Sequence, residues 1–164
     1  AEYFVDAVSA YRSDFALFPE FFNAPLMADN NHLPESEAIR ELAKHTESIV
    51  QRFSELAISY NINIITGSMP ELVDGVLYNI GYVCKRDGGM DRYEKLHVTP
   101  DESKVWALKG GNKLQTFDTD CGKIGVLICY DSEFPELSRL LADFPHPNVG
   151  LKAWYAPNRH GVKW

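Results

Sequence analysis

Three residues of this chain have side chains that could hydrolyse a substrate together, namely Cys129, Glu20 and Lys95. Cys129 follows the apolar run 124–128 and precedes the polar break 130–132, a pattern that predicts a strand running into a turn. A cysteine there is held by the strand and open to substrate, at the edge where α/β proteins build their sites. Free cysteines are more often inert, buried and apolar in character, so Cys129 needs partners to act as a nucleophile.

A nucleophilic cysteine needs a proton acceptor, most often a histidine. No sequence pattern makes a histidine the evident partner of Cys129; the candidates are His32, His45, His97, His146 and His160. A carboxylate can accept the same proton. Glu20 stands directly after the apolar, strand-length run Phe15–Pro19, so we expect it at a strand end as the general base. The alternative for Glu20 is a solvated loop glutamate.

Lys95 supplies the cation that such a site needs. It lies near the end of a predicted strand, where its ammonium group could lower the pKa of the thiol and donate to an oxyanion. Glu102, seven residues later, could orient Lys95 or a substrate. Each residue also has a simpler interpretation, because lysines are common at exposed strand ends and acidic residues are common where a helix starts after a proline such as Pro100.

The hydrophobic pattern predicts the elements that position these residues. Helical spacing appears in residues 1–14, in a long amphipathic helix over 35–60, and in 134–144, where Leu137, Leu140 and Leu141 share one side. Strands are predicted at 15–19 and 62–69, then in one hairpin over 76–86 and 90–97 and a second over 114–120 and 123–131. This order favours an α/β fold, a mixed sheet with helices on a face.

Composition excludes several classes of function. The formal net charge of −7 argues against nucleic-acid binding, which needs clustered Lys and Arg. No apolar run reaches the roughly 18 residues of a membrane-spanning helix, and the N-terminus has no signal-peptide pattern. We therefore expect a cytoplasmic protein with small-molecule or protein partners.

The cysteines and glycines suggest no cofactor. The three cysteines, Cys84, Cys121 and Cys129, form no CxxC pair and have no histidine at zinc-ligand spacing, so neither a disulfide framework nor a metal site is predicted. Residues 110–112 lack both the ending of a phosphate-binding loop and the spacing of a dinucleotide-binding loop.

Three segments, LFPE with Glu20, YEKLHVTPDE with Lys95 and Glu102, and ICYDSEFPE with Cys129, resemble the motifs of the nitrilase, or carbon-nitrogen hydrolase, superfamily. They occur in the order and at the spacing of that family. The resemblance covers residues 1–143, which we interpret as its domain. Within the family the chain is most similar to the branch in which the hydrolase follows an acetyltransferase domain.

The resemblance implies an α-β-β-α sandwich and a catalytic triad that hydrolyses amides or nitriles through a thioester. Glu20 would be the general base, Lys95 would stabilise the tetrahedral intermediate and Cys129 would be the nucleophile. The backbone N–H of Tyr130 would complete the oxyanion site, and Glu102 would support the triad. The family implies small-molecule substrates, no metal or organic cofactor, no nucleic-acid or membrane partner, and homo-oligomers for its full-length members.

The chain also departs from the family pattern. The expected first strand and the segments that follow the cysteine in family members are not recognised, so we expect a domain truncated at both ends, with residues 144–164 an atypical, irregular tail. A partial sandwich would expose apolar sheet surface and have low stability in isolation. Two alternatives therefore stay open, an inactive fragment or interaction module of the same fold, and a Cys-His thiol hydrolase.

Overall fold

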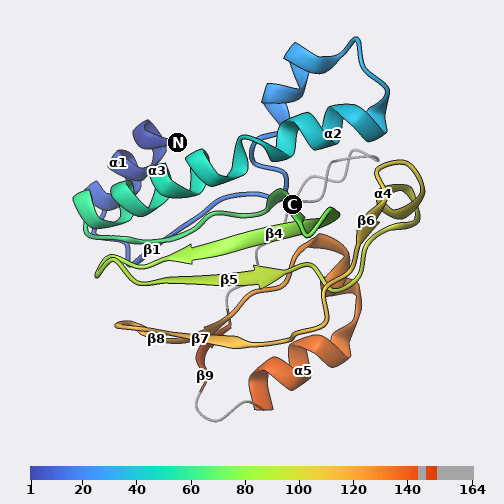
Figure 1. Cartoon of the computed structure of the whole chain (residues 1–164). Helices are drawn as coiled ribbons and strands as arrows, with labels where there is room; N and C mark the ends of the chain where they lie inside the picture. Colours follow the sequence, from blue (N-terminus) through green and yellow to red (C-terminus); the bar gives the residue numbers. More distant parts are fainter. Residues whose placement is uncertain (144–146, 151–164) are drawn as a thin grey trace, which may run out of the picture.

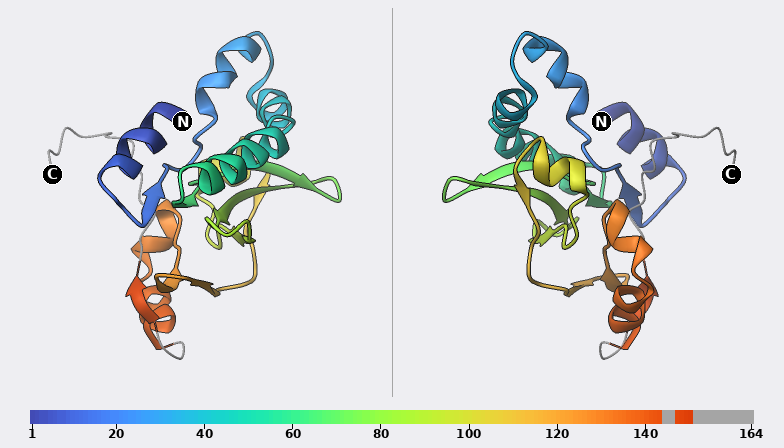
Figure 2. Two further views of the ribbon diagram at one scale, coloured as in Figure 1. Left: turned by 90° about the vertical axis from the view of Figure 1, so that its left-hand side faces the viewer. Right: turned by 90° about the vertical axis from the view of Figure 1, so that its right-hand side faces the viewer.

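Helices, two sheets and a further helix follow one another as layers in the computed structural model, which describes residues 1–143 and 147–150 (Figure 1). Helices α1 (Glu2–Ala10) and α3 (Thr46–Ser59) lie over the larger sheet, and the smaller sheet and α5 (Pro135–Asp143) lie on its other side. The side views show the same succession (Figure 2). The predicted α/β fold with a mixed sheet is thus confirmed.

The larger sheet is organised around its longest strand, β4. This strand pairs antiparallel with β2, β3 and β5 and parallel with β6, while β1 runs parallel to β2. The six strands are β1 (Phe15–Leu17), β2 (Asn63–Ile65), β3 (Met69–Val73), β4 (Val76–Cys84), β5 (Met90–Glu94) and β6 (Leu108–Lys109). The smaller sheet contains β7 (Thr116–Thr119), β8 (Gly122–Gly125) and β9 (Pro147–Gly150). Both predicted hairpins, β4–β5 and β7–β8, are present.

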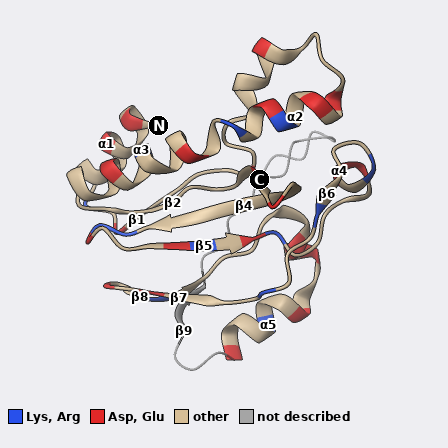
Figure 3. Ribbon diagram, viewed as in Figure 1, with Lys and Arg blue, Asp and Glu red and all other residues tan. Residues whose placement is uncertain are grey.

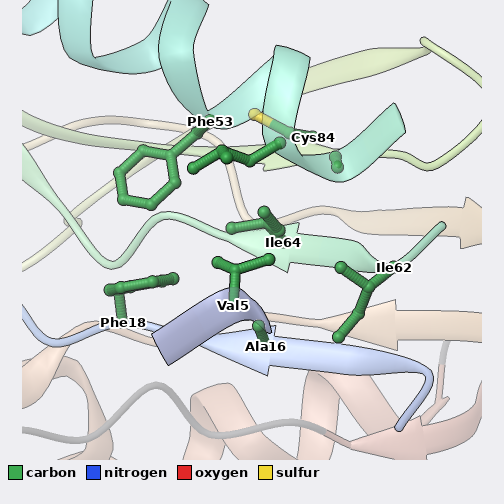
Figure 4. Packing of buried hydrophobic residues seen from close by; sticks show 9 residues of the cluster. Val5, Ala16, Phe18, Phe53, Ile62, Ile64 and Cys84 are labelled. Carbon is green, nitrogen blue, oxygen red and sulfur yellow. The ribbon is translucent and has the colours of Figure 1, made fainter. Parts of the chain in front are cut away.

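Separate apolar clusters hold these layers together. Between the helices and the larger sheet, Phe53 of α3 packs with Val5 of α1 and Ile64 of β2 (Figure 4). Between the two sheets, strands of the first sheet meet strands of the second through Ile65, Val83, Tyr93, Phe117, Ile124, Val126 and Ile128. Charged residues occur along the helices and also within β5 (Figure 3).

The prediction of a single helix over residues 35–60 is wrong. The structure contains two helices, α2 (Glu35–Ala43) and α3, with a break at Lys44 and His45. The two helices pack on different clusters, since α2 covers Leu77 and Leu108 while α3 covers the cluster around Phe53. A change of direction is therefore needed, and the periodicity of the sequence does not reveal it.

Two further details of the helices differ from the predicted pattern. Leu140 of α5 is 53% exposed and Tyr11, the residue after α1, is 86% exposed, whereas Leu141 of α5 and Val5 of α1 are buried. Leu141 packs against Gly125 of β8, and this contact sets the buried side of α5. The apolar stripe of each helix is thus narrower than its sequence suggests.

The predicted irregular tail contains one regular element. Residues 147–150 form β9, which pairs in parallel with β8, so the expectation of irregular structure over 144–164 is wrong for these four residues. The remainder of that prediction, at 144–146 and 151–164, lies outside the described residues. Parallel pairing depends on a partner strand that is distant in the chain, so the local sequence of a short segment with prolines does not predict it.

The segment that carries Glu20 is fixed by a close approach to Gly67. The strand predicted over 62–69 is interrupted there, because β2 ends at Ile65 and β3 starts at Met69. Gly67 has a left-handed backbone with φ of +69°, and a methyl group on it would lie 1.9 Å from the carbonyl oxygen of Pro19. Glu20 itself forms a parallel bridge with Ser68. Gly67 thus allows the two backbones to meet.

Replacing this glycine separates steric contact from backbone strain. Gly67→Ala and Gly75→Ala both introduce a side chain at a left-handed position, but Gly75 has no heavy atom within 4 Å of the added methyl group. We expect Gly75→Ala to lower the free energy of unfolding by about 1 kcal/mol. Gly67→Ala should lower it by about 1–3 kcal/mol more, because Pro19 must move. Urea unfolding measures both, and equal losses would contradict the contact.

Candidate active site

A buried ammonium group between two carboxylates forms the centre of the site. Lys95 Nζ lies 2.7 Å from Glu20 Oε1, and 2.8 and 2.9 Å from the two carboxylate oxygens of Glu102. The side chains are 1%, 7% and 6% exposed for Lys95, Glu20 and Glu102. The structure therefore brings these three predicted residues together, although 75 positions separate Glu20 from Lys95.

Lys95 is held by the sheet and kept charged by its partners. It follows β5 directly, and its amide N–H donates to the carbonyl of Asn79 on β4 over 2.9 Å. Burial lowers the pKa of Lys95, but the charges and hydrogen bonds of Glu20 and Glu102 together raise the pKa by more, so it lies above its ordinary value. Lys95 is accordingly a cation at neutral pH.

Glu102 has the two roles that the sequence left as alternatives. It is the third residue of α4 (Pro100–Lys104), where it forms a capping box with Thr99. Its Oε2 accepts from the Thr99 amide over 2.6 Å, while both of its oxygens accept from Lys95. The start of a helix thus fixes the carboxylate that faces the ammonium group.

Cys129 stands at a sharp turn between the smaller sheet and α5. Strand β8 ends at Gly125, earlier than predicted, and Cys129 begins the 3-10 helix η2 (Cys129–Glu133) with a left-handed φ of +44°. The first hydrogen bond of this turn joins the Asp131 amide to the Ile128 carbonyl, so the amides of Cys129 and Tyr130 come before it. The half-buried thiol and the Tyr130 amide therefore lie at the same exposed turn.

The thiol of Cys129 is held in its neutral form. Burial raises its pKa most, the charge and a hydrogen bond of Glu20 raise it further, and Lys95 lowers it, with a net result of about 12. Lys95 acts on this pKa in the expected direction and lowers it, but burial and Glu20 raise it by more. A nucleophile in this state needs a base that removes the proton during attack.

All four side chains border one cavity of about 800 Å³. Glu20, Lys95, Glu102 and Cys129 line it, together with Trp106. Among the described residues no histidine contributes to the lining, so the Cys-His alternative has no partner for Cys129 there. Over residues 1–143 and 147–150, the part of the chain that the structure describes, His, Cys, Asp and Glu side chains form no group that could hold a metal ion.

Two buried polar residues beside this cavity were not predicted from the sequence. Asn79 on β4 donates from Nδ2 to Glu20 Oε1 over 2.9 Å. Asp131, two residues after Cys129, accepts from the amides of Leu96 and His97 over 3.1 and 2.7 Å, which joins the cysteine turn to the chain that follows Lys95. A polar residue inside the otherwise apolar run VLYNIGYVC was the available signal for Asn79.

A comparison with known families identifies the family of this chain. The model of the family described as "Carbon-nitrogen hydrolase" matches residues 1–143. The chain therefore belongs to the carbon-nitrogen hydrolase family.

Relatives of this carbon-nitrogen hydrolase chain include "Probable hydrolase YhcX" from Bacillus subtilis, 47% identical over 142 residues, which cover 87% of the chain and 28% of the relative. Human "Omega-amidase NIT2" is 33% identical over 149 residues, which cover 85% of the chain and 51% of the relative. The chain thus spans about half or less of the length of these proteins. The relationship to an acetyltransferase-fused branch stays a prediction.

A solved structure supports the same membership at the level of the fold. The crystal structure of Saccharomyces cerevisiae Nit3, described as a member of branch 10 of the nitrilase superfamily, superposes with a TM-score of 0.71 at 30% sequence identity. The match covers 86% of the chain and 52% of Nit3. In the described part of this carbon-nitrogen hydrolase chain, the helices are too short or too polar to cross a membrane.

The environment of Cys129 predicts how its reactivity changes with pH. In Glu20→Gln the negative charge that raises the thiol pKa is removed while Lys95 stays, so the pKa should fall. At a fixed pH below the thiol pKa, each unit by which that pKa falls raises the thiolate fraction about tenfold. Iodoacetamide should therefore label Cys129 about tenfold faster or more in Glu20→Gln at pH 8. Peptide mass spectrometry separates Cys129 from Cys84 and Cys121.

The matched control is Glu71→Gln, which removes one negative charge from β3, outside the lining of this cavity. It should leave the labelling of Cys129 unchanged. Slower labelling in Glu20→Gln, or equal acceleration in both variants, would contradict the assigned electrostatics.

Proposed function

We propose that this chain carries the catalytic residues of a hydrolase for non-peptide carbon-nitrogen bonds in small amides or nitriles, with residues 1–143 as its domain. The observation that carries the proposal is the buried ammonium group of Lys95 between Glu20 and Glu102, on the wall of the cavity that contains Cys129. Burying three charges costs several kcal/mol per ion, and packing alone does not require them.

In the first half-reaction Cys129 Sγ attacks the carbonyl carbon of an amide, and Glu20 accepts the thiol proton in the same step. This concerted transfer suits a thiol whose pKa is raised to about 12. The carbonyl oxygen becomes an oxyanion, and protonated Glu20 then gives its proton to the leaving nitrogen. The carbon-nitrogen bond breaks, ammonia or an amine leaves, and a thioester remains on Cys129.

In the second half-reaction a water molecule hydrolyses the thioester. Glu20, again a carboxylate, accepts a proton from the water while the water oxygen attacks the acyl carbon. The bond to Sγ breaks, the proton returns to the sulfur, and a carboxylic acid is released. One residue thus acts as base and acid in turn, which requires that its carboxylate stay within reach of both the sulfur and the substrate.

Lys95 and the Tyr130 amide would stabilise the oxyanion. When Glu20 accepts a proton it loses its charge, so its attraction to Lys95 Nζ weakens as the oxyanion forms. An N–H group of Lys95 can then donate to the oxyanion while Glu102 keeps the ammonium group in place. The Tyr130 amide precedes the hydrogen bonds of η2, which leaves it available as the second donor.

Ammonia release from short aliphatic amides tests the proposal. The chain should hydrolyse such amides, and Cys129→Ala should reduce the rate by about 1,000-fold or more because the covalent route is lost. Cys121→Ala, which removes a half-buried thiol from the β7–β8 turn outside the cavity, should retain the rate. Hydroxylamine should intercept the thioester as a hydroxamate.

Hydrolysis by Cys129→Ala at the normal rate would overturn the nucleophile. A folded chain with no amidase or nitrilase activity would instead support the alternative of a non-catalytic module of the same fold.

A further inference from the structure

Asn79 contacts both members of the buried ion pair at the site proposed above. It lies within β4 and is fully buried. Its side chain donates to Glu20 Oε1 over 2.9 Å, and its carbonyl accepts from the Lys95 amide over 2.9 Å. One residue of the central strand thus holds the carboxylate by its side chain and the lysine by its backbone.

The chemistry of the contact defines how the Asn79 amide is turned. A carboxylate oxygen only accepts hydrogen bonds, so the side-chain nitrogen must face Glu20. Asn79 Oδ1 is then buried, and it has no hydrogen-bond partner among the described residues. Burying an unpaired carbonyl group costs free energy, and leucine would fill a similar volume without that cost. The favourable contribution of the Asn79 side chain must therefore come from the N–H group that it donates to Glu20.

The Asn79 donor makes the hydrogen bonding of the two oxygens of Glu20 unequal. Oε1 accepts from both Lys95 Nζ and Asn79 Nδ2, at 2.7 and 2.9 Å. Among the described residues no N–H group donates to Oε2. A carboxylate oxygen with two donors has little capacity for another, so Oε2 is the oxygen that can accept a proton.

We propose that Asn79 is a positioning residue that fixes Oε1 of Glu20 as the anchored oxygen and turns Oε2 toward the Cys129 thiol and the substrate. The inference rests on the proposed function, in which Glu20 is the general base. Without the donor, the carboxylate keeps Lys95 but can rotate about its terminal bond, and its anionic form is less well stabilised.

Other charged groups also act on Glu20 and must stay unchanged in a test. The titratable and charged groups that line the same cavity are Lys95, Cys129, Glu102, Glu35 and Asp101. Asn79 is neutral, so replacing it leaves the charge of the site unaltered. The effect of such a replacement therefore reports the lost hydrogen bond and not a change of charge.

The test compares Asn79→Leu with Asn63→Leu. Asn63 lies on the neighbouring strand β2 and is also fully buried. Its Nδ2 also donates to a carboxylate, that of Asp120, over 2.9 Å to Oδ1. Asn79→Leu should lower kcat for short aliphatic amides by about 10- to 100-fold with KM nearly unchanged. The acid limb of its pH-rate profile should move to higher pH, and Asn63→Leu should leave the limb in place.

Asn79→Met provides a second variant without a donor, in which a flexible apolar side chain can fill the same space. Positioning by the donor predicts a loss similar to that in Asn79→Leu. Activity close to that of the unaltered chain in Asn79→Met would indicate a packing role and overturn the inference.

A measurement without turnover separates this inference from the proposed function. A crystal structure of Asn79→Leu should show the Glu20 carboxylate rotated about its terminal bond, whereas Asn63→Leu should keep the orientation of the unaltered chain. If the chain hydrolyses amides but Asn79→Leu behaves like Asn63→Leu in both measurements, the inference is overturned and the proposed function stands. If the chain is inactive, a Glu20 carboxylate with the same orientation in both variants still overturns the positioning role.

Discussion

The charge of Lys95 is the constraint on which the rest of this structure depends. An ammonium group that is 1% exposed is tolerated only where carboxylates surround it, and Glu20 and Glu102 do so from different parts of the chain. Removing one partner from such a buried pair typically costs about 3–5 kcal/mol. The elements that deliver these residues, the end of β1, the end of β5 and the start of α4, must therefore keep their relative positions.

Backbone strain gathers at the same place. Cys129 and Phe21, the residue after Glu20, both have left-handed φ values, +44° and +50°. Such conformations are unfavourable for residues with a β-carbon, and they persist only where the surrounding structure holds them. Here the Ser68 bridge and the hydrogen bonds of Asp131 supply that support. Both turns aim a side chain at the cavity, in keeping with the roles proposed for Glu20 and Cys129.

The sequence predicted most of the fold and only part of the site. The β4–β5 and β7–β8 hairpins were predictable because residues 87–89 and Cys121-Gly122 are local turn signals. The break between α2 and α3 was not, because it depends on which cluster each helix covers. Asn79 and Asp131 were missed for the same reason: a buried polar residue acquires its meaning from a partner that is distant in the sequence.

The sequence by itself determined which side chains were available, in what order, and that each follows a strand or starts a helix, because propensity and hydrophobic periodicity are local properties. Only the tertiary structure decided their electrostatics. It placed Lys95 between two carboxylates, raised the pKa of Cys129 mainly through burial, and left Glu20 Oε2 with no N–H donor from the described residues. Those outcomes depend on distances of about 3 Å between distant segments and on burial, where charges interact strongly, and neither is written in a local pattern.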